Sequence, residues 1–252
     1  MSSSLEPHQQ NLEEHSLVDH LVELRKRVIY IVIGVAVGAI VSWFFKEQIF
    51  DLIRSPISPY LKDSDGGLIY TSPMENFMAY IKMSALSGLI LSCPFWLYHL
   101  WKFIAPALYK NERKYAVGFI FLGSLLFIAG VSFVYFVVYP IAFEFLLSFG
   151  SGQDQALIKV SEYLSFFFNT TLLFGLAFEM PLILSILGVL GVINKSFLVK
   201  NRRYAIMILA LSSAVMTPPD PASMLLMMLP MLLLFELSII LVGVLSPKER
   251  SL

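Results

Sequence analysis

The sequence predicts an all-α, polytopic membrane protein with six transmembrane helices and both termini on the cytoplasmic side. Its residues are 57% hydrophobic and only 14% charged, whereas about a quarter of the residues in soluble domains are charged. The apolar residues form long blocks, and a helix needs roughly 20 of them to cross a bilayer. Alternating ten-residue strands are not seen, so helices rather than a barrel satisfy the backbone in lipid.

Six apolar stretches are the expected spans of a single transmembrane domain covering residues 16–245. They are residues 28–45, 77–98, 116–139, 163–190, 204–217 and 222–245. The fifth stretch rises only about 21 Å at 1.5 Å per residue, which is less than the hydrocarbon core. Because prolines follow it directly, we expect the last two helices to form a short hairpin. Residues 1–15 and 246–252 are the expected polar tails.

Lysine and arginine residues predict the orientation, because they gather in cytoplasmic loops. With the N-terminus inside, the outside segments carry only Lys46, Arg54, Lys62 and Lys159. The other basic residues, except Lys82 within a span, fall in the inside segments. This bias favours an N-in, C-in arrangement.

Several function classes find no support in the sequence. The formal net charge is zero, so bulk nucleic-acid binding is not expected. Nucleophile–base pairs, zinc-spacing motifs and Gly-rich phosphate loops are not seen. We therefore predict no enzyme, no cofactor and no metal site. Cys93, the single cysteine, is interpreted as a small buried hydrophobic residue.

The N-terminal arm is predicted to be an amphipathic helix that leads straight into the first span. Ser16 to Asp19 resembles a capping box at the start of that helix. Glu23 and Arg27 lie on its polar side at i,i+4 spacing. This pair is either an ordinary salt bridge on the helix surface or part of a binding site.

The first inside loop holds a candidate binding carboxylate, Glu112. It stands among the basic residues Lys110, Arg113 and Lys114 and is the only acid in either inside loop. One interpretation is a local salt bridge. The other is a carboxylate that binds an incoming arginine, whose guanidinium offers two parallel N–H groups. Lysine lacks that fork, so such a site would prefer arginine.

Glu179 lies well within the fourth span, where an acid is expensive and is a functional candidate by default. Its alternative role is a buried acid that holds helices together. Lys82 and Glu236 lie nearer span ends and are expected to snorkel or pair. Glu144 and His99 are interpreted as interfacial, with His99 in a loop.

Four motifs, in order along the chain, resemble the TatC family of the twin-arginine protein translocase. They are His20 to Arg27, Phe103 to Arg113, Phe174 to Pro181 and Thr217 to Asp220. The resemblance covers about residues 17–245. It implies a glove-like, concave bundle in which the last two helices are short.

The resemblance also implies roles for single residues. Glu23 and Glu112 match acids that recognise the twin-arginine motif, and Phe103 matches an aromatic residue that shapes that site. Arg25 matches a basic residue of the N-terminal motif. Glu179 matches an intramembrane acid linked to partner subunits. The outer-side positions matched are Pro56 and Asp220, for which turn chemistry alone is the other interpretation.

The function implied is export of folded proteins across a bacterial inner membrane, driven by the proton-motive force. The expected partners are single-span subunits of the TatA and TatB type, twin-arginine signal peptides, further copies of the chain and the lipid bilayer. The main alternative is a proton-coupled solute transporter that uses Glu179, and it predicts solute uptake by the purified chain in vesicles. A purely structural scaffold would tolerate loss of Glu112 and Glu179.

Overall fold

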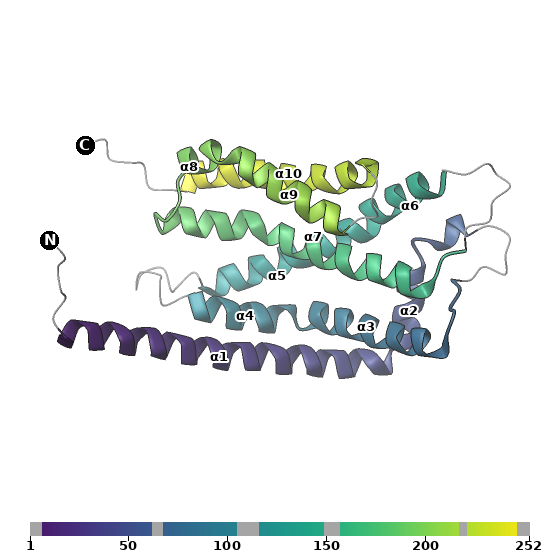
Figure 1. Cartoon of the computed structure of the whole chain (residues 1–252), viewed down its shortest axis with the longest axis horizontal. Coiled ribbons are helices and arrows are strands. Elements are labelled where there is room, and N and C mark those ends of the chain that lie inside the picture. Colours follow the sequence, from purple (N-terminus) through teal and green to yellow (C-terminus); the bar gives the residue numbers. More distant parts are fainter. Residues whose placement is uncertain (1–6, 62–67, 105–115, 149–156, 217–220, 246–252) are drawn as a thin grey trace.

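The computed structural model describes residues 7–61, 68–104, 116–148, 157–216 and 221–245. Over these residues the chain is almost entirely helical, and the long helices run side by side along one axis (Figure 1). The described part contains no strand, only one isolated bridge between Ile69 and Lys159. The predicted all-α class is therefore confirmed.

The first helix, α1 (Pro7–Phe44), is 38 residues long and packs along α3 (Pro73–Leu91). Two glycines permit the close approach, because a Cβ on Gly88 would lie 2.3 Å from the backbone nitrogen of Ala39, next to Gly38. Since α1 begins at Pro7, the predicted helix start at Ser16 is wrong. The residues before Ser16 include good helix formers such as Glu13 and Glu14.

The second predicted span, residues 77–98, is broken. The helix α3 ends at Leu91, and α4 (Cys93–Ile104) continues at an angle of 62° to it. Pro94 is the second residue of α4, and a proline there has no N–H to continue the hydrogen bonding of α3. The hydroxyl of Ser92, between the two helices, donates to the carbonyl of Gly88 at 2.7 Å.

The third span is longer than predicted. The helix α5 (Ala116–Phe133) passes through a π-helical turn, η4 (Val134–Val138), into α6 (Tyr139–Ser148). Together they give 31 consecutive residues suited to a membrane, Gly118–Ser148. The segment after residue 139, expected outside the membrane, therefore begins as helix.

The C-terminal half consists of α7 (Val160–Val189), α8 (Lys195–Lys200), α9 (Arg202–Met216) and α10 (Pro221–Leu245). Within the described residues, four helices are long and apolar enough to span a membrane, or five if α3 and α4 form one span. The helix α9 has 15 residues and is not among these spanning helices. This agrees with the prediction that the fifth apolar stretch is shorter than the hydrocarbon core. Six spans remain a prediction.

The two ends of the bundle carry different elements. The start of α1, the end of α10 and the short helix α8 lie at one end, called here the α8 end (Figure 1). At the opposite, α2 end lie α2 (Lys46–Arg54), η1 (Ser58–Tyr60) and the starts of α3 and α7. The described residues between the first two expected spans thus form one short α-helix and one short 3-10 helix.

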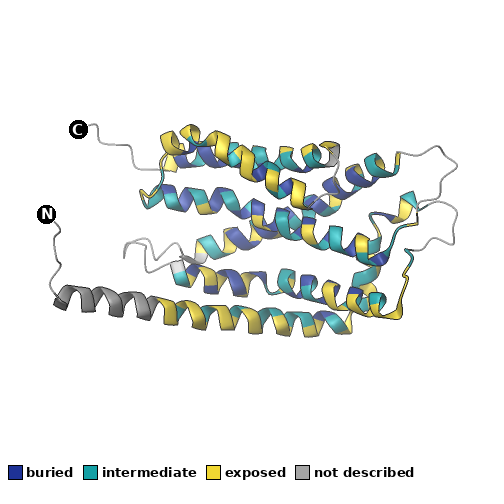
Figure 2. Ribbon diagram, viewed as in Figure 1, coloured by how far each residue is buried: buried dark blue, intermediate teal, exposed yellow. Residues whose placement is uncertain are grey.

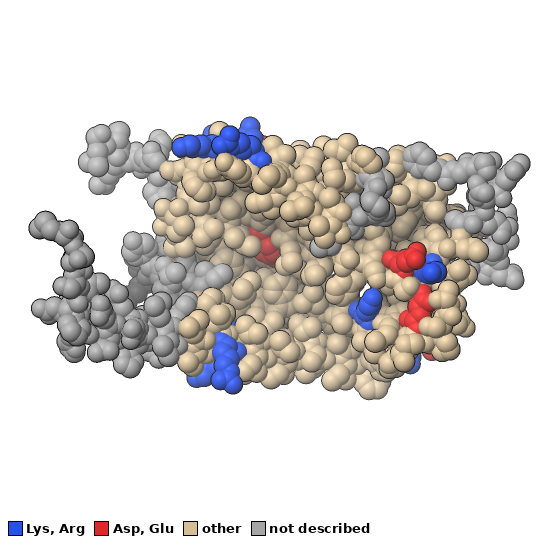
Figure 3. All heavy atoms as spheres, viewed as in Figure 1, with Lys and Arg blue, Asp and Glu red and all other residues tan. Residues whose placement is uncertain are grey.

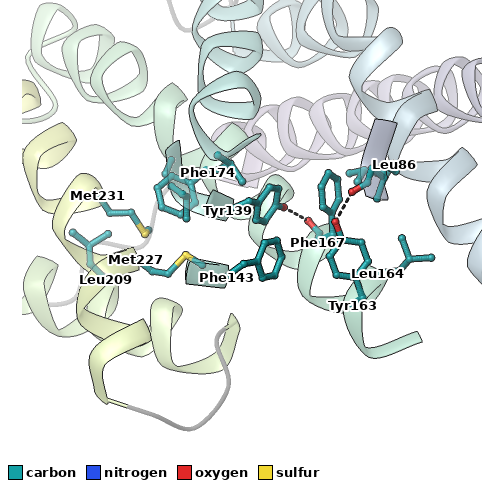
Figure 4. Packing of buried hydrophobic residues seen from close by; sticks show 14 of the residues in the cluster. Leu86, Tyr139, Phe143, Tyr163, Leu164, Phe167, Phe174, Leu209, Met227 and Met231 are labelled. Atoms are coloured by element: carbon teal, nitrogen blue, oxygen red, sulfur yellow. Dashed lines mark hydrogen bonds between the residues drawn. The ribbon is translucent and has the colours of Figure 1, made fainter. Parts of the chain in front are cut away.

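The helix α7 is central and α1 is peripheral. Half of the apolar stretch of α7 is buried, against 11% of that of α1, and Figure 2 shows the long exposed surface of α1. The main core joins α7 to η4, α6 and α10. In it the Tyr139 hydroxyl donates to the carbonyl of Phe167 at 2.7 Å, and Met227 and Met231 of α10 reach toward the aromatic side chains (Figure 4).

Candidate functional site

Glu23 lies on α1 toward the α8 end, where the predicted i,i+4 pair is present. Arg27 Nη2 donates to Glu23 Oε1 at 2.8 Å. The Glu23 side chain is 35% exposed and that of Arg27 only 16%. The carboxylate thus already binds one guanidinium group and is still reachable from solvent.

Arg25 and Phe103 lie at the same end of the bundle. Arg25 is exposed on α1, and Phe103 is half-buried in the last turn of α4. The two helices pack antiparallel, with the Tyr30 and His99 rings stacked at a centroid distance of 5.2 Å. From this contact, α1 runs back to Glu23 and α4 runs forward to Phe103, so both residues lie toward the α8 end of the bundle.

Two predicted site residues, Glu112 and Asp220, lie outside the described residues. Pro56, predicted with Asp220 as an outer-side structural residue, is half-buried between α2 and η1. Its neighbour Ile57 is only 1% exposed and belongs to the main core. Pro56 therefore lies directly beside a core residue at the α2 end.

His99 differs from the prediction. It is not an interfacial loop residue, because it lies within α4 and is 8% exposed. Three aromatic rings surround it, those of Tyr30, Phe95 and Tyr98. Its Nδ1 has no hydrogen-bond partner within the described part of the chain. The high density of aromatic residues from Phe95 onward is the sequence signal that indicates a packed helix rather than a loop.

Glu179 is buried in the middle of the bundle, with 3% of its surface exposed. Its Oε1 has no hydrogen-bond partner among the described residues. Across the α5–α7 contact lies Gly123, where a Cβ would come within 3.1 Å of Glu179 Oε2. Because residue 123 is a glycine and has no side chain, the carboxyl group of Glu179 has room at this contact. Sequence reasoning did not identify this partner.

The other charged groups predicted to snorkel or pair do find polar partners. Lys82 Nζ donates to Ser165 Oγ at 3.3 Å, and Arg202 Nη2 donates to Glu236 Oε2 at 2.8 Å. Glu144 is exposed on α6. Cys93 is buried and free, as predicted. Among the described residues, no group of three or more His, Cys, Asp or Glu side chains is placed to hold a metal ion.

Charged side chains gather at the two ends of the molecule. On the face shown in Figure 3, basic groups dominate the α8 end, both signs occur at the α2 end, and a small acidic patch lies in the hollow between them. A membrane protein needs this distribution, since its middle zone faces hydrocarbon. The predicted site residues Glu23, Arg25 and Phe103 lie toward the α8 end, which is the basic end.

Comparison with known proteins decides the family. The sequence model of TatC, the Sec-independent protein translocase protein, matches residues 19–230. The chain belongs to the TatC family. The TatC of Desulforapulum autotrophicum is 37% identical over 239 residues, covering 95% of this chain and 88% of the relative. The TatC of Koribacter versatilis is 39% identical over 245 residues, covering 96% and 90%.

Solved structures agree with the TatC assignment. A crystal structure of the twin-arginine translocase receptor TatC superimposes with a TM-score of 0.81 at 37% identity, covering 88% of this chain and 97% of that one. The TatC resemblance drawn from the four motifs is thereby confirmed. The family is a component of a protein translocase rather than an enzyme family, and its members are multi-pass membrane proteins.

Proposed function

We propose that this chain is the signal-recognising core subunit of the twin-arginine translocase and binds twin-arginine signal peptides at the cytoplasmic face. The observation that carries the proposal is the 2.8 Å bond from the Arg27 guanidinium to Glu23. It supports a role for Glu23 as an acceptor for arginine side chains. Its partial exposure, 35%, lets a peptide reach it.

The recognition chemistry follows from the shape of the arginine side chain. A guanidinium group presents parallel N–H donors that fit a carboxylate, whereas the lysine ammonium is a point charge. Two carboxylates, Glu23 and Glu112, would each bind one arginine of the signal. Phe103 would supply an apolar wall to the site, and Arg25 would position the arm or the peptide backbone.

The wider function rests on the same proposal. The chain would export folded proteins across a bacterial inner membrane, independently of the Sec pathway and driven by the proton-motive force. Subunits of the TatA and TatB type would assemble beside the buried Glu179, and further copies of the chain would join the complex. The alternative function is a proton-coupled solute transporter that uses the buried Glu179. Uptake of solute by the purified chain in vesicles would support that alternative.

A peptide-binding assay tests the proposal. The full chain in detergent is titrated with a fluorescent signal peptide carrying either two arginines or two lysines. We expect the arginine peptide to bind more tightly. Replacing Glu23 and Glu112 together by Gln should weaken its binding at least about tenfold, which corresponds to about 1.4 kcal/mol, because each hydrogen bond to a charged group contributes about 1.5–3 kcal/mol.

Glu162→Gln is the matched control, because Glu162 is an exposed acid at the opposite, α2 end. It should bind both peptides as the unmodified chain does. Equal affinity for the arginine and lysine peptides, or unchanged affinity in the double variant, would contradict the proposed site.

A further inference from the structure

An apolar crevice lies between α1 and α3 near the α2 end. Its volume is about 280 Å³, and its walls include Ala39, Ile40 and Trp43 of α1 and Ile81, Ser84 and Ala85 of α3. Small-molecule pockets begin at about 300 Å³, so the crevice is just below the lower limit of that range. One turn of a helix, about 10–12 Å across and 5.4 Å long, occupies roughly 420 Å³ or more and does not fit this volume, whereas part of a single hydrocarbon chain does.

One wall of the crevice carries a hydroxyl group without a partner. Ser84 is 4% exposed, and its Oγ makes no hydrogen bond to any described residue. Buried polar side-chain atoms nearly always have a partner. The Ser84 hydroxyl can therefore donate to an acceptor on a molecule that enters the crevice.

A cation lies beside Trp43, a crevice residue near the α2 end. Lys46 Nζ lies 4.8 Å from the ring centroid of Trp43 and 5.7 Å from that of Tyr80. Tryptophan, tyrosine and lysine at the end of a span are typical of the membrane–water boundary. The crevice thus has apolar walls and one hydroxyl group, and a positive charge lies beside its Trp43 wall.

We propose that this crevice binds one acyl chain of an anionic phospholipid whose phosphate pairs with Lys46. Ser84 follows Tyr80 by four residues, a rise of about 6 Å along α3. Ser84 therefore lies deeper in the bundle, farther from the α2 end, than the Lys46 ammonium group. In a phospholipid the ester carbonyl likewise lies deeper than the phosphate, so a lipid whose phosphate pairs with Lys46 brings its ester carbonyl to the level of Ser84. The ester oxygen accepts from Ser84, and the acyl chain lies along the crevice against Ala39 and Ala85, outside the backbone contact of α1 with Gly88.

Trp43 provides a direct probe, since it lines the crevice. The chain has three tryptophans, and the other two, Trp96 and Trp101, are buried at 7% and 5% exposure. Replacing those two by Phe leaves Trp43 as the only indole. Its fluorescence is then measured in mixed micelles containing phosphatidylglycerol or phosphatidylcholine with brominated chains, which quench nearby indoles.

Half-maximal quenching should occur at an about five-fold lower mole fraction of brominated phosphatidylglycerol than of phosphatidylcholine, the factor expected for one basic residue near a lipid headgroup. Lys46→Gln should remove this difference. Lys159→Gln is the matched control, because Lys159 lies at the same end and pairs instead with Glu162 at 3.9 Å. It should keep the preference.

Ala85→Leu fills the crevice and should reduce quenching by both lipids. Equal quenching by the two lipids in the parent would mean ordinary boundary lipid and would overturn the proposal. So would a preference that survives Lys46→Gln, or no quenching of Trp43 at all. The readout uses no signal peptide, so its outcome is independent of the proposed translocase function.

Discussion

The carboxyl group of Glu179 and the missing side chain of Gly123 form one unit across the α5–α7 contact. The acid is 3% exposed, and a buried carboxyl group is tolerated only where the packing leaves room for it. Gly123 leaves that room, since a Cβ there would meet Glu179 Oε2 at 3.1 Å and Leu182 Cδ2 at 3.3 Å.

Gly123→Val should therefore destabilise the chain. Overpacking costs roughly 1–3 kcal/mol, and each kcal/mol lowers the melting temperature of a chain of this size by about 2–4 °C. Thermal unfolding in detergent measures the change. Gly118→Val is the matched control on the same helix, because a Cβ there meets no atom within 4 Å.

Adding Glu179→Ala to Gly123→Val should recover part of the lost stability, since it removes the atoms that the valine meets. If Gly123→Val and Gly118→Val melt at the same temperature, Glu179 and Gly123 are not packed as described.

At the scale of elements, Glu75 ties the starts of α3 and α7 together. Its Oε2 accepts from the backbone N–H and the hydroxyl of Thr71, both at 2.8 Å. Its Oε1 accepts from the N–H of Ser161 at 3.2 Å and from the Ser161 hydroxyl at 2.6 Å. The bridge between Ile69 and Lys159 lies beside this cluster. A single carboxylate thus serves both helix starts.

Glu75→Gln should loosen one of the two helix starts, because an amide has only one acceptor oxygen. A backbone N–H that loses its carboxylate acceptor opens more often to solvent, so we expect the amide of Thr71 or of Ser161 to exchange measurably faster. Hydrogen exchange with mass spectrometry of the two segments measures this.

Glu162→Gln is again a suitable control, because that exposed side chain lies next to Ser161 and makes only a 3.9 Å contact with Lys159. Unchanged exchange at both Thr71 and Ser161 in Glu75→Gln would show that other contacts hold these helix starts.

At the scale of the whole molecule, an even number of crossings returns the chain to the end from which it started. The start of α1 and the end of α10 both lie at the α8 end (Figure 1). The basic residues of α1, α8 and α9 lie at this end as well. The positive-inside rule therefore predicts that the α8 end faces the cytoplasm.

Cysteine labelling in intact cells tests this orientation. The single native cysteine, Cys93, is fully buried, so Cys93→Ala gives a cysteine-free parent. A membrane-impermeant maleimide should label Glu162→Cys at the α2 end from outside. Lys200→Cys at the α8 end should react only after the membrane is permeabilised. The reverse pattern would contradict the N-in, C-in arrangement.

The composition and order of the residues were sufficient to predict the helical class, the short fifth helix and the pairs at Glu23 and Glu236. The helical class and the short fifth helix follow from the length of the apolar segments. The pair at Glu23 follows from its i,i+4 spacing to Arg27, and Glu236 follows from the need of a charge near a span end to find a partner. These features are confirmed at α9, at Arg27 and at Arg202. The start of α1 and the position of His99 were predicted wrongly, since helix continuation and aromatic packing overrode the local signals.

Contacts between residues far apart in the chain required the folded structure. Gly123 and Glu179, Glu75 and Ser161, and Lys46 and Tyr80 meet because helices pack side by side, and no spacing in one sequence encodes such a meeting. The bend between α3 and α4 and the crevice beside α1 arise in the same way. Local propensity and hydrophobic length act within a segment, whereas shape complementarity between segments determines which buried polar groups come together.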